Sequence, residues 1–142
     1  MSKQSNDSEH MRAKWTKFEE MDLLSEYFDA RRNLSLATDK GIKSKAWTQL
    51  TAELNAKNKR NLTRVSQYKS KLDRLMRDYD LYKEITNLSG CGICPDTDKP
   101  LLDDDVWEKL IEARPKQKGK LKEFRKNGFE HKRICSLIAG GS

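Results

Sequence analysis

The sequence has little of what export, disulfide frameworks and membrane spans require. Its 142 residues include only three cysteines, three prolines and two histidines. An odd number of cysteines, in a chain whose first thirty residues contain no uninterrupted apolar stretch, favours free thiols in a reducing compartment. No apolar run approaches membrane-spanning length. We therefore expect a soluble intracellular protein with no membrane partner, organised around one compact domain.

Catalytic groups are equally scarce. The sequence contains no glycine-rich phosphate-binding loop, and its two histidines leave few candidates for a general base. The adjacent carboxylates of Asp103, Asp104 and Asp105 splay apart at the start of an expected helix, where the helix dipole stabilises them. We therefore expect no enzyme activity, no cofactor and no small-molecule substrate.

Charge, by contrast, is plentiful and unevenly distributed. Charged residues make up 36% of the chain, and the formal net charge is +7. Residues 56–77 hold eight basic residues against one acidic residue, and residues 114–133 hold nine against two. Residues 78–113 reverse the balance, with three against ten. The two basic blocks favour a polyanionic partner.

Hydrophobic periodicity predicts an all-α protein. After a flexible leader over residues 1–13, Thr16 and Glu19 form a capping-box signature that opens a helix over residues 17–32. A polar loop with turn residues follows this helix.

Two further helices are expected in the first two thirds of the chain. Ser44 is placed to cap a helix that ends near residue 55. Thr63 is placed to cap a long helix that continues to about residue 88, because apolar residues recur at spacings of three and four as far as Tyr82. The residues that this periodicity assigns to the core are Trp15, Phe18, Leu24, Phe28, Trp47, Leu50, Leu54, Tyr68, Leu72, Leu75, Tyr79 and Trp107.

The remaining segment predicts a helical extension. Gly90 and Gly92 end the long helix, and an acidic helix starts near Asp103 and closes at Pro115. Residues 116–122 are expected to form a mobile basic link. A last short helix is expected over residues 129–138, and its core-facing side chains should be Ile134 and either Leu137 or Ile138.

This order of elements resembles the Myb/SANT-like domain family, a trihelical relative of the Myb repeat in plant and fungal nuclear proteins and in Harbinger-type transposons. The resemblance lies in the following segments: Trp15-Thr16, Trp47, Gln67-Tyr68-Lys69-Ser70-Lys71-Leu72, Leu75, Tyr79-Asp80-Leu81-Tyr82, Ser89-Gly90-Cys91-Gly92, Asp104-Asp105-Val106-Trp107-Glu108, Arg114-Pro115 and Phe124-Arg125. One departure is that Leu72 takes the place of the third core tryptophan of a Myb repeat.

The resemblance implies a fold and a function. The expected fold is a three-helix helix-turn-helix bundle over residues 14–88 with a long third helix. A helical extension over residues 89–139 packs on that helix, and residues 140–142 form a tail. The implied function is binding of double-stranded DNA by the third helix in a nuclear transcription regulator, chromatin factor or transposon-derived factor.

The candidate DNA-binding residues lie on and just before the third helix. Arginine can pair with guanine, glutamine with adenine, and serine and lysine suit phosphates. The alternative is a solvated face in which Asp73 pairs with Arg77. The candidate residues are Lys57, Lys59, Arg60, Arg64, Ser66, Gln67, Lys69, Ser70, Lys71, Asp73, Arg74 and Arg77.

The second basic block predicts a mobile arm that seeks phosphates or serves as a nuclear import signal. Its residues are Lys116, Lys118, Lys120, Lys122, Arg125 and Lys126.

Cysteine and histidine spacing raises the question of zinc. Cys91 and Cys94, with His131 and Cys135, have the ligand types and local spacings of a zinc site. Glycines already explain the turn around Cys91, and Cys135 falls where a small helix residue would pack. We therefore favour buried or incidental thiols over a bound metal.

A protein-interaction module is the alternative function, because SANT relatives bind histone tails or partner proteins. In that case the acidic face over residues 96–112 would dock a histone tail or a transcription or transposition partner. A single Myb-like unit makes few base contacts, so we also expect specificity to require a homodimer or a neighbouring domain.

Overall fold

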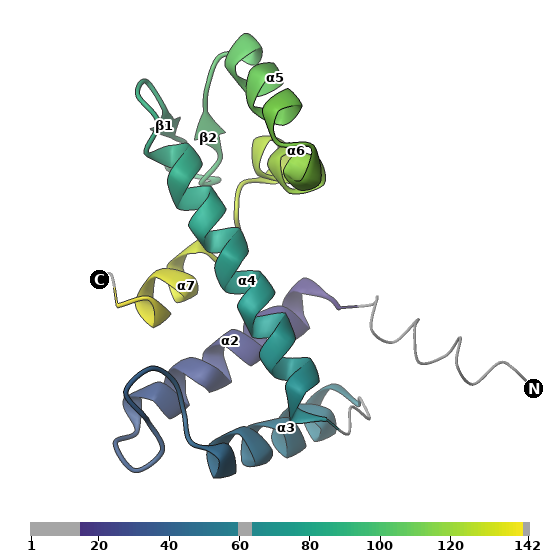
Figure 1. Cartoon of the computed structure of the whole chain (residues 1–142), viewed down its shortest axis with the longest axis vertical. Helices are drawn as coiled ribbons and strands as arrows, with labels where there is room; N and C mark the ends of the chain where they lie inside the picture. Colours follow the sequence, from purple (N-terminus) through teal and green to yellow (C-terminus); the bar gives the residue numbers. More distant parts are fainter. Residues whose placement is uncertain (1–14, 60–63, 141–142) are drawn as a thin grey trace, which may run out of the picture. The chain divides into compact units, whose positions relative to one another are not determined.

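A computed structural model of the chain describes residues 15–59 and 64–140, and helices account for most of them (Figure 1). The chain divides into two compact units, Met1–Ser70 (unit 1) and Lys71–Ser142 (unit 2), and one helix, α4, continues from the first into the second. The elements are α2 (Lys17–Arg32), α3 (Ser44–Asn58), α4 (Val65–Thr86), β1 (Gly92–Ile93), β2 (Pro100–Leu101), α5 (Asp104–Ala113), the 3-10 helix η1 (Pro115–Gln117), α6 (Lys118–Asn127) and α7 (Lys132–Ile138).

The start of α2 confirms the predicted capping box. The Thr16 hydroxyl accepts a hydrogen bond from the Glu19 N–H at 3.0 Å, and the Glu19 carboxylate accepts one from the Thr16 N–H at 3.0 Å. Two amides that the first turn leaves unpaired are thereby satisfied. The predicted leader lies outside the described residues.

The start of α3 differs from the prediction. Lys43, not Ser44, occupies the N-cap position, and no side chain caps it. The preceding loop is held instead by the Arg31 guanidinium, which donates to the carbonyls of Thr38 and Gly41 at 2.8 and 2.9 Å. α3 also runs three residues beyond the expected end.

The core of unit 1 forms where α2 packs against α3. Tyr27 and Trp47 lie with ring centroids 5.5 Å apart. The expectation for Phe18 was wrong, because its side chain is 70% exposed. At 100° per residue, a face of α2 that buries Leu24 and Tyr27 places Phe18 on the opposite side. The buried apolar residues of unit 1 are Leu23, Leu24, Tyr27, Ile42, Ala46, Trp47, Leu50, Leu54 and Tyr68, whereas Trp15 and Phe28 are half-buried.

α4 confirms the predicted long helix and its buried stripe, which includes Leu72, Leu75, Tyr79 and Tyr82. Leu81 and Ile85 are buried as well, so the covered face of α4 widens toward its C-terminal end. Tyr82 accounts for part of this packing, because its ring lies 5.5 Å from those of Phe124 and Phe129. Thr63, the expected cap of α4, lies outside the described residues.

Residues 89–113 form a short hairpin and then the expected acidic helix. β1 and β2 pair antiparallel, with Gly92 opposite Leu101 and Ile93 opposite Pro100. α5 ends at Ala113, two residues before Pro115, and buries Trp107 to 2% exposure.

The expectation of a mobile basic link over residues 116–122 was wrong. η1 leads directly into α6, and the α6 residues Leu121 and Phe124 are fully buried, with 0% exposure. Two apolar residues three apart are enough to order this lysine-rich segment, because both are buried in the core of unit 2.

α7 begins at Lys132 and not at Phe129. Its inward residue is Cys135, while Ile134 and Ile138 are half-buried and Leu137 is 43% exposed. Within the described residues, no helix combines the length and apolar character needed to cross a bilayer.

Candidate nucleic-acid interface

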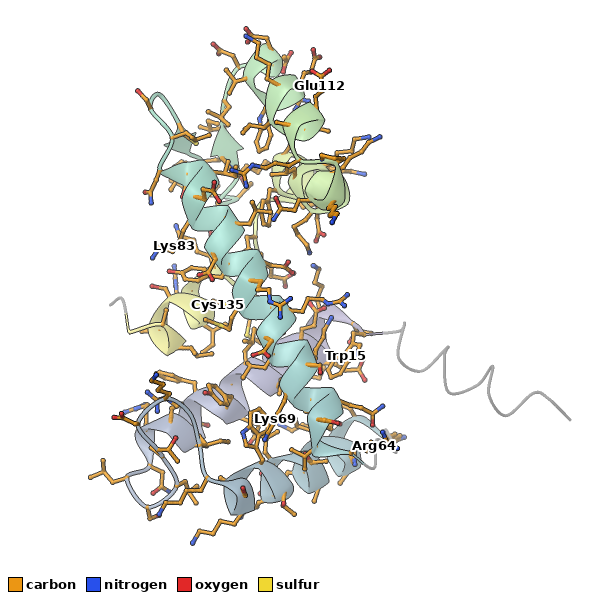
Figure 2. The ribbon with its side chains drawn as sticks, viewed as in Figure 1. Trp15, Arg64, Lys69, Lys83, Glu112 and Cys135 are labelled. Atoms are coloured by element: carbon orange, nitrogen blue, oxygen red, sulfur yellow. The ribbon has the colours of Figure 1, made fainter. Side chains whose placement is uncertain are left out.

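One side of α4 presents polar and basic side chains to solvent. Ser66, Ser70, Arg74 and Arg77 are all exposed. Helix geometry places these four residues within a sector of about 80°, and we call them the α4 stripe. Figure 2 labels Arg64 and Lys69, which add two more exposed cations near the start of the same helix.

The two arginines of the α4 stripe form no ion pairs within the described residues. In the part of the chain that the structure describes, no carboxylate forms an ion pair with Arg74 or Arg77. In particular, Asp73 is exposed but does not pair with Arg77, which was the alternative that the sequence left open. Both guanidinium groups can therefore offer their full set of N–H donors to a ligand.

Other predicted contact residues of α4 have contacts within the protein. The Gln67 side-chain oxygen accepts a long hydrogen bond of 3.4 Å from the Arg64 N–H and so helps to cap the helix. The Lys69 ammonium lies 5.6 Å from the centre of the Trp47 ring, and Lys71 is half-buried. These three side chains are less available to DNA than the α4 stripe.

The basic residues before α4 separate into two kinds. The Lys57 ammonium lies 3.9 Å from Asp22 and 3.8 Å from Glu26, so it is drawn toward carboxylates of α2. Lys59 ends α3 in the left-handed conformation with its side chain exposed. Arg60 lies outside the described residues.

On this side of α4 the exposed basic residues stop at Arg77. Helix geometry places the buried Leu81 within the same sector and the carboxylates Asp80 and Glu84 beside or at its edge, and Glu84 is paired with Arg114. From Arg64 to Arg77 the helix rises about 20 Å, enough to lie along a major groove for part of a turn.

The six cations predicted as a basic arm fall into paired and exposed groups. Lys120 lies 3.3 Å from Asp78 and 3.1 Å from Glu123, and Arg125 is paired with Asp104. The sequence could not indicate this division, because Asp78 and Asp104 lie on other helices. The remaining four are exposed and form no ion pair within the described residues: Lys116, Lys118, Lys122 and Lys126.

The cysteine and histidine set does not converge. Among the described residues, no three His, Cys, Asp or Glu side chains gather as metal ligands. Cys94 sits in the hairpin turn, where hydrogen bonds from the Thr97 hydroxyl and then from the backbone N–H groups of Thr97 and Asp96 lower the pKa of its thiol. Cys135 is buried, and desolvation raises the pKa of its thiol to about 12.

The acidic segment over residues 96–112 is exposed along α5. Asp105, Glu108 and Glu112 face solvent and form no ion pair in the region that the structure covers (Figure 2 labels Glu112). Asp98, by contrast, lies 3.5 Å from the Lys132 ammonium. A basic partner is the chemistry that these carboxylates fit.

A comparison with known protein families matches most of the chain. The sequence model of the Myb/SANT-like DNA-binding domain family matches residues 14–110, which include α2, α3, α4, the hairpin and most of α5. No curated protein and no solved structure matches the chain. η1, α6 and α7 lie beyond the matched residues.

Proposed function

This chain belongs to the Myb/SANT-like DNA-binding domain family, and from this we propose that it binds duplex DNA in the nucleus, as part of a transcription regulator, chromatin factor or transposon-derived factor. The α4 stripe would lie in the major groove. The observation that carries the proposal is the presence of two exposed arginines, Arg74 and Arg77, with no ion pair in the described chain.

The chemistry of the α4 stripe suits base readout. An arginine can donate two parallel hydrogen bonds to O6 and N7 of guanine, and each such pair contributes about 1–3 kcal/mol of discrimination. Ser66 and Ser70 can donate to phosphate oxygens, which fixes the register of the helix without reading sequence. Asp73 either accepts a hydrogen bond from cytosine or disfavours close approach of a phosphate.

Phosphate contacts would come from cations beside the α4 stripe. Lys59 and Arg64 are exposed, and Arg60 belongs to the same basic run of the sequence. Lys57, Lys69 and Lys71 would contribute less, because each already has partners within the protein.

The decisive experiment first selects bound duplexes from a random pool and then measures affinity by fluorescence anisotropy. Arg74→Ala with Arg77→Ala should weaken binding to the selected sequence by about tenfold or more, because two guanine contacts are lost. The matched control is Lys83→Ala with Lys109→Ala, which removes the same charge from exposed positions elsewhere. Equal losses in the two double variants would contradict base readout by the α4 stripe.

The exposed carboxylates of α5 support a second candidate function, the docking of a basic protein segment such as a histone tail. Glu108→Gln with Glu112→Gln should then abolish binding of a lysine-rich tail peptide and leave DNA affinity unchanged or higher. Absence of duplex binding at low salt, together with binding of the peptide, would favour this function over DNA binding.

A further inference from the structure

We propose that α6 carries a second duplex-binding surface, so that one molecule holds two DNA segments at once. The surface consists of Lys118, Lys122 and Lys126, which we call the α6 ridge. The proposal extends the DNA binding proposed for α4, but it concerns different residues, which lie beyond the range matched by the family.

The α6 ridge is a continuous basic edge of one helix. Its three lysines are spaced four residues apart, so they follow one another along the helix at intervals of about 6 Å. All three are exposed, and none forms an ion pair within the described residues. Lys116 in η1 extends the same charge by one more exposed side chain.

The other two basic residues of α6 show that this arrangement is selective. Lys120 forms an ion pair with Asp78, and Arg125 forms one with Asp104. Cations that stabilise unit 2 are therefore paired, and the cations of the α6 ridge remain available for an external anion.

A glycine also lies on this side of α6. Gly119 is exposed, and a Cβ atom there would have no neighbour within 4 Å. Helix geometry places it beside Lys122 and Lys126, opposite the buried Leu121 and Phe124. Glycine is less favourable than alanine inside a helix, and its lack of a side chain leaves room for a DNA backbone to approach the helix closely.

The α6 ridge and the α4 stripe face different directions within unit 2. α6 lies beside the C-terminal half of α4 (Figure 1), where Lys120 contacts Asp78 and Phe124 contacts Tyr82. Viewed down the axis of α4, Asp78 and Tyr82 lie on a side of the helix about 100° away from the centre of the α4 stripe. The α6 ridge lies on the side of α6 that faces away from α4.

A straight duplex docked on Arg74 and Arg77 would therefore leave the α6 ridge facing solvent. The ridge spans about 12 Å, which corresponds to three or four phosphates along one strand of B-form DNA. Its lysines are flexible point charges without the planar donor fork of arginine, so the ridge contacts phosphates and its binding to the second duplex is independent of sequence.

The test is a capture assay with the whole chain. A selected duplex is immobilised, protein is bound at one molecule per duplex, and a second fluorescent duplex of random sequence is added. Lys118→Gln, Lys122→Gln and Lys126→Gln together should reduce capture of the second duplex at least tenfold, while affinity for the first duplex changes less than threefold. A plot of the logarithm of the capture binding constant against the logarithm of salt concentration should also have a slope that is less negative by about three.

The matched control carries Lys40→Gln, Lys83→Gln and Lys109→Gln, which remove the same charge from exposed positions outside the α6 ridge. Circular dichroism verifies folding of each variant, and sedimentation selects the monomeric fraction so that a dimer cannot supply the bridge. Equal capture by the ridge and control variants would overturn the proposal.

The assay separates this proposal from that for α4. If Arg74→Gln with Arg77→Gln leaves binding to the selected duplex intact, readout by α4 is wrong. The ridge proposal then still stands or falls on whether the ridge variant loses capture of the random duplex.

Discussion

Two of the three cysteines lie in environments that shift the thiol pKa in opposite directions, so they should differ in reactivity. Hydrogen bonds from Thr97 and Asp96 lower the pKa of the Cys94 thiol, whereas burial raises that of Cys135 to about 12. Because the thiolate is the nucleophile, iodoacetamide at pH 7.5 should alkylate Cys94 first and Cys135 only after unfolding. Peptide mass mapping over time measures both rates. Similar rates for the two cysteines in the folded protein would contradict the environments described.

Glu26 provides a prediction of pH dependence. Desolvation, followed by repulsion from Glu53, raises the pKa of its carboxyl group, although Lys57 acts in the opposite direction. The folded-state pKa lies above the unfolded value, so the contribution of Glu26 to stability is greatest at low pH and is lost as pH rises through the raised pKa.

Glu26→Gln should therefore increase the free energy of unfolding at pH 7 by about 0.5 kcal/mol, the size expected of a partly exposed charge. The increase should vanish near pH 3.5, where the carboxyl group of the unaltered protein is protonated. Urea denaturation at the two pH values tests this, with the exposed Asp39→Asn as the control. A larger effect at the lower pH would show that the sign is wrong.

At the scale of elements, Gly128 fixes how α6 ends. It is the C-cap of α6 with φ 77°, and a Cβ atom would lie 2.3 Å from the Thr97 carbonyl oxygen. Gly128→Ala should destabilise the protein by about 3 kcal/mol, because both the backbone conformation and the hairpin turn must change. Thermal unfolding followed by circular dichroism measures the loss, and a change below about 1 kcal/mol would be inconsistent with this close approach.

Gly119, in the first turn of the same helix, should behave in the opposite way. Its Cβ position is open, so Gly119→Ala should increase stability by about 0.5–1 kcal/mol through helix propensity alone. The same unfolding experiment compares the two glycine variants directly. A destabilising effect at Gly119 would mean that the helix is not regular there.

Local signals predicted the elements that depend on local contacts. The capping box at Thr16 and the apolar stripe ending at Tyr82 are contained in short windows of sequence, and α2 and α4 have the expected bounds to within about two residues where these are described. α6 was missed because only Leu121 and Phe124 are apolar among its lysines, and their burial depends on partners elsewhere in unit 2. The hairpin was missed because its two-residue strands pair across a turn.

The candidate site was predictable to the same extent. Helical periodicity predicted that Arg74 and Arg77 face solvent, which the structure shows. Periodicity alone could not identify which cations are already paired, because the partners of Lys57 and Lys120 lie on other helices. The capping role of Gln67 was also missed, although a glutamine three residues after a helix start is a recognised signal.

At the scale of the whole molecule, the charge distribution makes DNA binding sensitive to salt. If three to five of the exposed cations contact phosphates, the logarithm of the binding constant should fall with the logarithm of salt concentration with a slope of about −3 to −5. Anisotropy titrations between 50 and 300 mM salt would provide this slope. A slope near zero would mean that the basic blocks do not bind the DNA backbone.

The distribution of indole rings has a practical consequence. Trp15 and Trp47 belong to unit 1, and Trp107, 2% exposed, belongs to unit 2. In a variant with Trp15→Phe and Trp47→Phe, all tryptophan emission comes from Trp107, and in Trp107→Phe it comes only from the other two. Each half of the chain thus contains its own intrinsic fluorophore, and the order in which the halves melt can be recorded without attaching a dye.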